Sequence, residues 1–471
     1  MNLSKIKRIY MIGIKGVGMT MLAQFLVAKD IEVSGSDTKE KFMTDKVLKN
    51  SGIKVIENFS ANNIPADTNL IIYSSAYNKD NNTEMQAIEN LKIEKLSYAE
   101  ALGQIFNNHY GIAVVGSHGK TTTTAWLGYV LEKANLAPNV LVGAMVPQFG
   151  GNALVGRSDY FVIEADEYQN KLKYYNPRVV LLNNIDYDHP DFFPTVADYN
   201  QVFIEFIEKI PSKGFLVANF DDPTIRKIAN VNSRAKVISY AINEVSDYVA
   251  YDIKSFNGKE FFKVKIVVDE TEDDEEAVAN KELGDFSIQL IGKHNIYNAL
   301  AVIATCIELN IDLVKIRKYL EEFSGTARRM EIMGEHNGAI IIDDYAHHPT
   351  EIKATLSGIE KLYPQKNKIV VFHPHTFTRT KALLNDFAKS FLDADELIIL
   401  DIYGSAREIQ GGVSSEELVR KIKEVNNKIK VQYIPTQKEA ENYLRKQASI
   451  GDVIILMGAG DVFRIGEKLI K

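Results

Sequence analysis

The chain has 471 residues, 45% of them hydrophobic and 25% charged, which is typical of a globular protein with a full core and long enough for about three domains of roughly 150 residues each. A formal net charge of −7 argues against nucleic acid as the main partner, so anionic substrates must be received by local basic side chains and backbone donors. No apolar run approaches the roughly 18 residues that span a membrane, and the first residues lack a signal-peptide profile, so we expect a cytoplasmic protein.

The first region predicts a βαβ nucleotide-binding unit. A strand leads into a glycine-rich loop and a helix, and a second strand at 32–34 ends near Asp37, whose carboxylate could bond a ribose hydroxyl. The loop glycines are Gly13, Gly16 and Gly18. Their spacing differs from the dinucleotide fingerprint G-x-G-x-x-G, so we expect another nucleotide or a diphosphate, with NAD(P) and a purely structural turn as alternatives. A further strand at 70–73 ends in Ser74 and Ser75, at the end of the strand where open sheets bind ligands.

A phosphate-binding loop is the most informative motif of the second region. It follows an apolar strand predicted at 112–115 and precedes a helical pattern. Its residues are Gly116, Ser117, His118, Gly119, Lys120, Thr121 and Thr122. Backbone N–H groups of such a loop close around phosphate oxygens, Lys120 reaches the β- and γ-phosphates, and the Thr121 hydroxyl can hold Mg²⁺. The loop is a shortened variant, because the general spacing needs glycine where Val114 stands, and it predicts that the protein uses ATP.

Acidic side chains follow two further strands of this region. The sequence E-A-D-E at 164–167 comes after one strand, and a stretch ending in Asp188 and His189 comes after the next. Alternating strands and helices imply a largely parallel sheet covered on both faces, so these side chains should meet at one edge. Carboxylate oxygens suit Mg²⁺, while His189 is either an added ligand or a side chain that caps its loop. A charged run at 269–276 is expected to be a solvated loop between strands.

Two more motifs follow toward the C-terminus. Residues 292–298 open an apolar helix that contains Cys306, the single cysteine, which we expect to fill the core rather than to act as a nucleophile. After Gly325 strands and helices alternate again, and a strand at 339–342 leads into the sequence D-D-Y-A-H-H-P-T at 343–350. Its paired histidines could be metal ligands, general bases or hydrogen-bonding groups of the loop.

Together these motifs resemble those of the Mur ligases, ATP-dependent amide-bond-forming enzymes of peptidoglycan assembly, over essentially the whole chain. The matches lie at residues 13–18, 116–122, 164–167, 184–189, 292–298, 328–329 and 343–351. The resemblance implies an α/β fold with three domains. These are a Rossmann-like UDP-sugar domain at 1–107, a central P-loop ATPase-like domain with a mostly parallel sheet at 108–325, and a C-terminal Rossmann-like domain at 326–471 that binds the amino acid and closes.

The resemblance also implies roles for individual residues. Contacts to the UDP-sugar are implied for Gly13, Gly16, Gly18, Asp37, Ser74 and Ser75. Contacts to ATP are implied for residues 116–122 and for His294, Asn295, Asn298, Arg329 and Asp343. Ligation of Mg²⁺ or Mn²⁺ is implied for Thr121, Glu164 and His189. Catalysis is implied for Lys120, His348 and Arg379, and contact with the amino acid for Tyr345, His347 and Arg379.

Within the family, the chain is most similar to the members that join L-alanine to the carboxylate of UDP-N-acetylmuramate through an acyl phosphate, for cell-wall biogenesis and hence cell shape and division. The stretch 375–381 departs from their pattern H-R-Y-[ST]-R-T-R, since Thr376 and Lys381 stand where arginines are usual. Residues 165–168 and 188–193 favour an alternative, ligation of a recycled L-alanyl-γ-D-glutamyl-diamino acid tripeptide to the same UDP-sugar. Alternatives from a different class are an NAD(P)-dependent oxidoreductase and an ATP-binding regulatory module.

Overall fold

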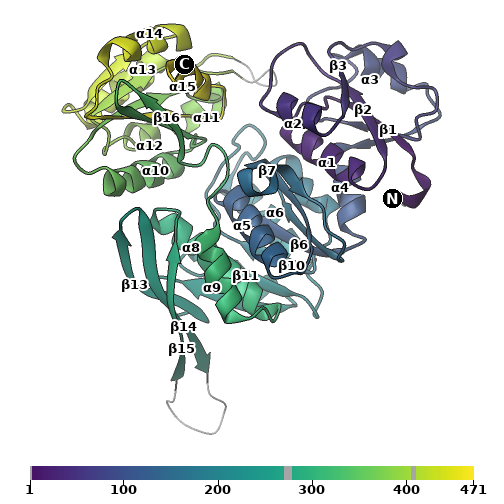
Figure 1. Ribbon diagram of the computed structural model, residues 1–471, viewed down its shortest axis with the longest axis horizontal. Coiled ribbons are helices and arrows are strands. Elements are labelled where there is room, and N and C mark those ends of the chain that lie inside the picture. Colours follow the sequence, from purple (N-terminus) through teal and green to yellow (C-terminus); the bar gives the residue numbers. More distant parts are fainter. Residues whose placement is uncertain (1–2, 270–277, 405–409, 471) are drawn as a thin grey trace.

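Three separate β-sheets, one in each lobe of the molecule, organise the computed structural model of the chain, which describes residues 3–269, 278–404 and 410–470 (Figure 1). The N-terminal lobe (purple) and the C-terminal lobe (yellow) lie side by side above the central lobe (blue to green). The three α/β lobes confirm the expected fold class, while the domain limits at 107/108 and 325/326 stay predictions. Within the described ranges no helix is long and apolar enough to cross a membrane.

The N-terminal lobe is a five-stranded parallel sheet in the order β3-β2-β1-β4-β5. Its elements are η1 (Leu3–Lys5), β1 (Arg8–Ile12), α1 (Val17–Val27), β2 (Glu32–Ser36), α2 (Thr44–Asn50), β3 (Lys54–Ile56), η2 (Ala61–Asn63), β4 (Leu70–Tyr73), α3 (Thr83–Ile88), β5 (Glu94–Ser97) and α4 (Tyr98–Phe106). The central strand β1 is apolar and buried almost throughout, as a parallel strand covered on both faces requires. The carboxyl ends of β1, β2 and β4 bring the glycine loop, Asp37 and Ser74 to one edge of the sheet.

The central lobe has a ten-stranded sheet in the order β15-β14-β13-β12-β11-β10-β6-β9-β7-β8. Its elements are β6 (Tyr110–Val115), α5 (Lys120–Lys133), β7 (Asn139–Val146), η3 (Pro147–Phe149), β8 (Gly151–Leu154), β9 (Tyr160–Glu164), η4 (Tyr168–Tyr174), β10 (Val179–Leu182), α6 (Val196–Ile207), β11 (Phe215–Asn219), α7 (Pro223–Asn232), β12 (Lys236–Ala241), β13 (Tyr248–Phe256), β14 (Lys259–Asp269), β15 (Val278–Ile288), α8 (Lys293–Glu308) and α9 (Leu313–Glu322). The pairing is parallel from β7 through β13 and antiparallel at β8, β14 and β15, which confirms a largely parallel sheet.

Two expectations for the central lobe have different outcomes. Cys306 is fully buried in α8, and burial raises the pKa of its thiol, which confirms its role in the core. The charged run at 269–276, expected to be a solvated loop, begins at the end of β14, and residues 270–277 lie outside the described part of the chain.

The C-terminal lobe is a six-stranded sheet in the order β16-β17-β21-β18-β19-β20, with only the edge strand β16 antiparallel to its neighbour. Its elements are β16 (Glu331–His336), β17 (Ala339–Asp344), α10 (Pro349–Leu362), β18 (Asn367–Phe372), α11 (Phe377–Ala382), α12 (Leu384–Ala388), β19 (Glu396–Ile399), α13 (Ser415–Val425), β20 (Lys430–Tyr433), α14 (Gln437–Gln447), β21 (Asp452–Met457) and α15 (Phe463–Leu469). The loop between β17 and α10 carries the paired histidines toward the central lobe.

Candidate active site

The phosphate loop joins the end of β6 to the start of α5, as its sequence predicts. Gly119 is the residue before α5 and has a φ of 79°, in the left-handed region that favours glycine. A Cβ atom at Gly119 would lie 2.5 Å from the side-chain oxygen of Asn298, so the space also admits only glycine. The loop is held from below by Asn184, whose side-chain oxygen accepts the His118 backbone N–H at 2.7 Å. These contacts present a rigid loop at the N-terminus of α5, where backbone N–H groups attract anions.

Lys120 and Thr121, at the start of α5, each contact a glutamate at or just after the end of β9. The Lys120 ammonium donates to the Glu167 carboxylate at 2.9 Å and to the carbonyls of Gly116 and Ser117. Burial by itself would lower the pKa of Lys120, but the neighbouring carboxylates outweigh it and raise the pKa, so the ammonium stays charged. The Thr121 hydroxyl donates to Glu164 at 2.8 Å.

A second group of ligand atoms lies beside Lys120. Asp166, Glu167 and His189 each offer one atom, and all three atoms lie within 4.8 Å of one another. Two carboxylates and an imidazole suit a divalent cation such as Mg²⁺ or Mn²⁺, so the residues fit the metal that the sequence implied. The expected ligands were Thr121, Glu164 and His189, but the structure divides them between two groups. Glu164 contacts Thr121, whereas His189 lies against Glu167, with 3.6 Å between His189 Nε2 and Glu167 Oε1.

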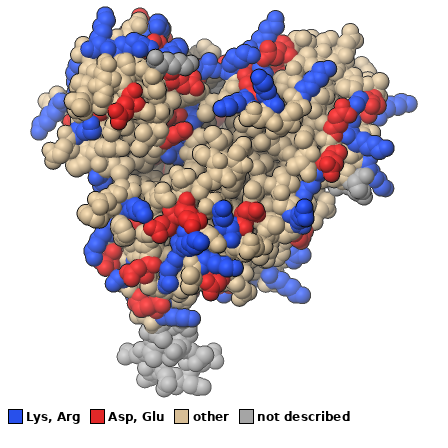
Figure 2. Space-filling model, in the orientation of Figure 1, with Lys and Arg blue, Asp and Glu red and all other residues tan. Residues whose placement is uncertain are grey.

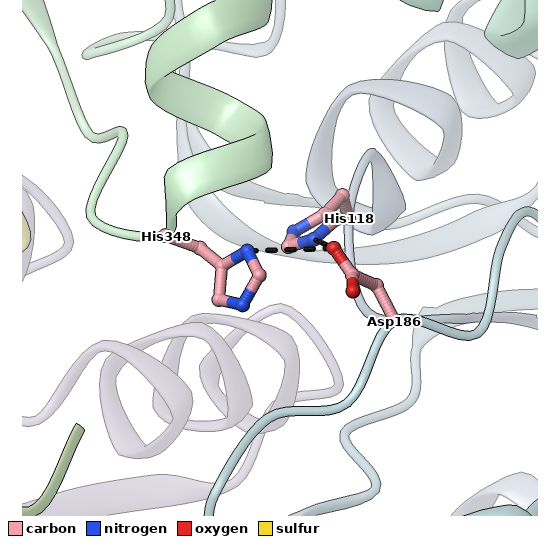
Figure 3. A group of neighbouring side chains, drawn as sticks. All are labelled: His118, Asp186 and His348. Atoms are coloured by element: carbon pink, nitrogen blue, oxygen red, sulfur yellow. Dashed lines mark hydrogen bonds and ion pairs between the residues drawn. The ribbon is translucent and has the colours of Figure 1, made fainter. Parts of the chain in front are cut away.

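The central and C-terminal lobes meet at a carboxylate that both lobes contact. Figure 3 shows His118, from the phosphate loop, and His348, at the start of α10, each directing a ring nitrogen at Asp186. The distances to the same Asp186 oxygen are 3.0 Å from His118 Nε2 and 3.4 Å from His348 Nδ1, and the Thr350 hydroxyl donates to that oxygen at 2.6 Å. The other ring nitrogen of His118 lies 3.4 Å from Glu351, on α10.

These contacts separate the charges of the two histidines. Burial would lower the pKa of His118, but Asp186 and Glu351 outweigh it and raise the pKa to about 9. Burial and the neighbouring His118 lower the pKa of His348. At neutral pH a charged His118 therefore sits between two carboxylates, one from each lobe, beside a neutral His348.

A cavity of about 920 Å³ opens between the phosphate loop, the start of α8 and the C-terminal lobe. Of the residues expected to contact ATP, those that line it are His118, Gly119, Thr122, His294, Asn295, Asn298 and Arg329. Asp343 is not among the lining residues; it is buried with its carboxylate 2.9 Å from Arg328 Nε, and its neighbour Asp344 lines the cavity instead. Burial raises the pKa of Asp343 to about 6, against the opposing charge of Arg328.

The residues expected to contact the amino acid come together on the C-terminal lobe. The Tyr345 ring lies under the guanidinium groups of Arg328 and Arg329, at 4.9 Å and 5.3 Å from the ring centre. His347 contacts the Tyr345 carbonyl, and burial lowers the pKa of its imidazole to about 3. Arg379 is engaged by Asp188 of the central lobe, at 2.9 Å and 3.1 Å.

The residues expected to contact the UDP-sugar gather at the carboxyl edge of the N-terminal sheet. A Cβ at Gly13 would lie 2.9 Å from Ser74, which shows how closely the glycine loop approaches the end of β4. Asp37 accepts hydrogen bonds from the backbone of Lys15 and Thr38 and from the Tyr77 hydroxyl. These three hydrogen bonds use the Asp37 carboxylate to order the glycine loop and the start of the segment that follows β2.

Among the acidic residues of the site to which the sequence assigned no individual role, four form an ion pair with a predicted site residue. They are Glu167, Asp186, Asp188 and Glu351. All four belong to motifs that the sequence does display, but a motif does not say which of its acids faces a partner on another element. Glu351 had a usable signal, since it is the third residue of α10 and completes a capping box with His348.

Charged side chains of both signs are interspersed over the face drawn in Figure 2, which agrees with the expectation of small-molecule substrates.

The chain matches three family models: Mur ligase family, catalytic domain, over residues 8–110; Mur ligase middle domain, over 114–306; and Mur ligase, glutamate ligase domain, over 328–460.

Similar proteins cover the whole chain. A UDP-N-acetylmuramate–L-alanine ligase from Alkaliphilus metalliredigens (strain QYMF) is 40% identical over 100% of this chain and 98% of its own. A protein of the same name from Desulfitobacterium hafniense (strain Y51) is 39% identical over 98% of this chain and 99% of its own. The structure of a UDP-N-acetylmuramate-alanine ligase from Thermotoga maritima shares the fold, with a TM-score of 0.81 over 98% of both chains and 23% identity. Because these matches run through all three lobes, including the loops that build the site, the chain belongs to the Mur ligase family.

Proposed function

We propose that the protein is an ATP-dependent ligase that joins L-alanine to the carboxylate of UDP-N-acetylmuramate. The observation that carries the proposal is the placement of Lys120, Thr121 and the acids at and after the end of β9 at one sheet edge, beside a cavity that the C-terminal lobe borders. The relatives named as UDP-N-acetylmuramate–L-alanine ligases match over the full length and support this substrate pair. The expected cytoplasmic location stays a prediction.

The reaction needs two displacements. The sugar carboxylate attacks the γ-phosphorus of ATP, the bond to ADP breaks, and an acyl phosphate forms. The amine of L-alanine then attacks the acyl carbon, the bond to phosphate breaks, and the nitrogen gives up a proton as the amide forms. Since phosphoryl transfer depends mainly on positioning and electrostatics, no nucleophilic side chain of the protein is required.

Lys120 supplies the main protein charge for the first displacement. Its ammonium is fixed by Glu167 and by two loop carbonyls, so it is already placed where a β- or γ-phosphate would lie against the loop. Arg329 lines the cavity beside the phosphate loop, on the side of the C-terminal lobe, and is held by Glu351 at 3.4 Å. Charge from both lobes thereby converges on the phosphates only when the lobes are together.

Two groups of side chains could each hold a divalent cation, Mg²⁺ or Mn²⁺. One group is Thr121 with Glu164, and the other is Asp166 and Glu167 with His189. When bound, the cation would neutralise charge on the phosphate oxygens. The protein's own contribution is to hold these carboxylates in place, as the Lys171 ammonium does for Asp166 at 2.5 Å.

The contacts between lobes exclude water from the reaction. His118, Asp186 and Thr350 close one side of the cavity, and the Asp188–Arg379 ion pair joins the lobes through buried side chains. An acyl phosphate hydrolyses in water, so a closed site protects it until the amine attacks. Tyr345, His347 and Arg379 lie on the C-terminal lobe where they can receive the amino acid.

The test is phosphate release from ATP and Mg²⁺ in the presence of UDP-N-acetylmuramate, with L-alanine, L-serine, glycine and the tripeptide supplied in separate reactions, and with product masses recorded. We expect the L-alanine product and phosphate in equal amounts. Preferential formation of the tripeptide product would reassign the amine substrate while retaining the ligase mechanism. No phosphate release with any amine, from a folded protein, would reject the ligase.

A further inference from the structure

A buried lysine lies inside the glycine-rich loop of the N-terminal lobe. Lys15 stands between Gly13 and Gly16, and its side chain is only 2% exposed, although lysine is rarely buried. The site described above assigns it no role. A buried ammonium needs hydrogen-bond acceptors, so its partners indicate what it holds.

Two of the four partners of the Lys15 ammonium are backbone carbonyls of one segment, residues 38–41, between β2 and α2. The ammonium donates to the carbonyl of Thr38 at 2.9 Å and to the carbonyl of Glu40 at 3.0 Å. It also donates to Glu57 at 2.9 Å and lies 3.3 Å from Asp45. Burial would lower the pKa of Lys15, but these two carboxylates outweigh it, and the pKa is raised. The charged ammonium therefore ties the glycine loop to two carbonyls of the segment.

The same segment also touches the C-terminal lobe. The backbone carbonyl of Lys41 accepts a hydrogen bond from the Arg464 guanidinium, on α15. Arg464 is in turn oriented by Asp461, with 3.6 Å between Nε and the carboxylate. One side of the segment is thus held by the glycine loop and the other by α15.

The segment directly follows Asp37, whose carboxylate is expected to contact the ribose. Asp37 accepts the Lys15 backbone N–H at 2.7 Å and the Thr38 backbone N–H at 2.8 Å. The glycine loop, Asp37 and the segment are therefore one hydrogen-bonded unit. The Lys15 ammonium bonds the Glu40 carbonyl, and Arg464 bonds the carbonyl of the next residue, Lys41, so the glycine loop is linked to the docking contact through one peptide unit.

We propose that Lys15 is a positioning residue that couples occupation of the UDP-sugar site to docking of the C-terminal lobe, by holding residues 38–41 in the conformation that Arg464 recognises. The inference rests on the proposed function, because it takes the glycine loop as the sugar-nucleotide site. It predicts that the nucleotide sugar, by ordering the loop, favours closure before the amine reacts. Without the Lys15 ammonium, the segment can move independently of the loop.

The kinetic test compares Lys15→Met, Arg464→Ala and the double variant. Each single change should lower kcat/KM for UDP-N-acetylmuramate, by about 10-fold for Lys15→Met, because a charged hydrogen-bonding group is removed from a buried site. If both residues act through the same segment, their effects should not add. The kcat/KM of the double variant should then lie within about twofold of that of the less active single variant. Effects that multiply would overturn the proposal. Lys39→Met is the matched control, since Lys39 is an exposed lysine of the same segment, and it should retain wild-type activity.

A direct measurement of closure separates coupling from a purely structural role. The single cysteine, Cys306, is fully buried, so dyes can be attached at Asn90→Cys and Lys446→Cys, two exposed positions on the N-terminal and C-terminal lobes. Saturating UDP-N-acetylmuramate should raise energy transfer between the dyes in the wild-type background. The rise should be lost in Lys15→Met and in Arg464→Ala, and kept in Lys39→Met.

A full rise in both variants would overturn the proposal, even if their activity had fallen. If Lys15→Met does not fold, Lys15→Gln replaces it in both tests, since it removes the charge and keeps a polar group at the buried position. Turnover of the wild-type protein with UDP-N-acetylmuramate reports separately on the proposed function, so failure of the ligase and failure of the coupling are distinguishable.

Discussion

Arg379 of the C-terminal lobe and Asp188 of the central lobe form a two-pronged ion pair across the lobe boundary, with Nε 2.9 Å from Oδ1 and Nη2 3.1 Å from Oδ2. Both residues are buried, and the Arg379 guanidinium holds the pKa of Asp188 well below its usual range despite that burial. The ion pair uses two N–H donors of Arg379, the residue that the family resemblance implies in binding the amino acid. Lobe closure and amino-acid binding therefore converge on one side chain.

Asp188→Asn should weaken closure, because it leaves a buried guanidinium without its counter-charge. Breaking a buried pair in this way costs about 3 kcal/mol or more, so we expect kcat/KM for L-alanine to fall by about 100-fold. Steady-state phosphate release measures the effect. Asp393→Asn, at an exposed aspartate of the C-terminal lobe that carries Arg379, is the control and should behave as wild type. Equal activity of the two variants would show that the pair contributes nothing to turnover.

Lys120→Ala should abolish most of the activity while leaving the fold intact. The ammonium acts on the transferring phosphoryl, and its removal should raise the barrier by about 3 kcal/mol or more, a loss of at least 100-fold in kcat. Lys133→Ala, at the exposed end of the same helix, is the matched control. Circular dichroism and thermal unfolding of both variants check the fold, and near-normal turnover of Lys120→Ala would contradict the assignment of the phosphate loop.

His189→Ala should raise the concentration of Mg²⁺ needed for half-maximal activity, because neutral imidazole would be one of the ligands. Glu167→Gln should have a similar effect and should also free the Lys120 ammonium, which Glu167 holds at 2.9 Å. Titration of activity with Mg²⁺ and with Mn²⁺ measures both. An unchanged titration for His189→Ala would assign the metal to Thr121 and Glu164 without it.

The contact of His118 with Asp186 and Glu351 should stabilise the protein at neutral pH and be lost in alkali. The pKa of His118 is raised to about 9 in the folded protein, above the value of about 6.5 for an unfolded chain. The stabilisation is therefore complete below about pH 6.5 and disappears as the pH rises through about 9. We expect the difference in Tm between the wild-type protein and His118→Gln to shrink as the pH rises from about 6.5 to about 9. A constant difference in Tm across the whole range would contradict the charged state of His118.

Thr376→Arg should lower KM for L-alanine. A guanidinium binds a carboxylate with two parallel hydrogen bonds, which neither the Thr376 hydroxyl nor the Lys381 ammonium reproduces, and Arg379 is shared with Asp188. Thr376 has a φ of 69°, which is unfavourable for a β-branched residue, so arginine adds no backbone strain there. A competition assay among L-alanine, L-serine, glycine and the tripeptide should show relaxed selection in the wild type and sharper selection in the variant. Tight selection by the wild type would contradict this.

The sequence by itself determined the local chemistry of this protein. Apolar runs followed by glycines, as at Gly116 and Gly119, specify a strand, a tight loop and a helix through short-range sterics, so the phosphate loop could be placed correctly. The parallel sheets follow from the alternation of apolar strands with helices. The antiparallel pairing of β14 with β13 and with β15 was not predicted, because half-exposed strands carry a weaker apolar signal.

Only the tertiary structure decided which charged groups are partners. Glu164 and Glu167 are three residues apart, yet the first contacts Thr121 and the second Lys120. Asp188 meets Arg379 across 191 residues of sequence. Such pairs depend on how three separate sheets approach one another, and electrostatic contacts between elements distant in the chain leave no periodic pattern for a sequence to display.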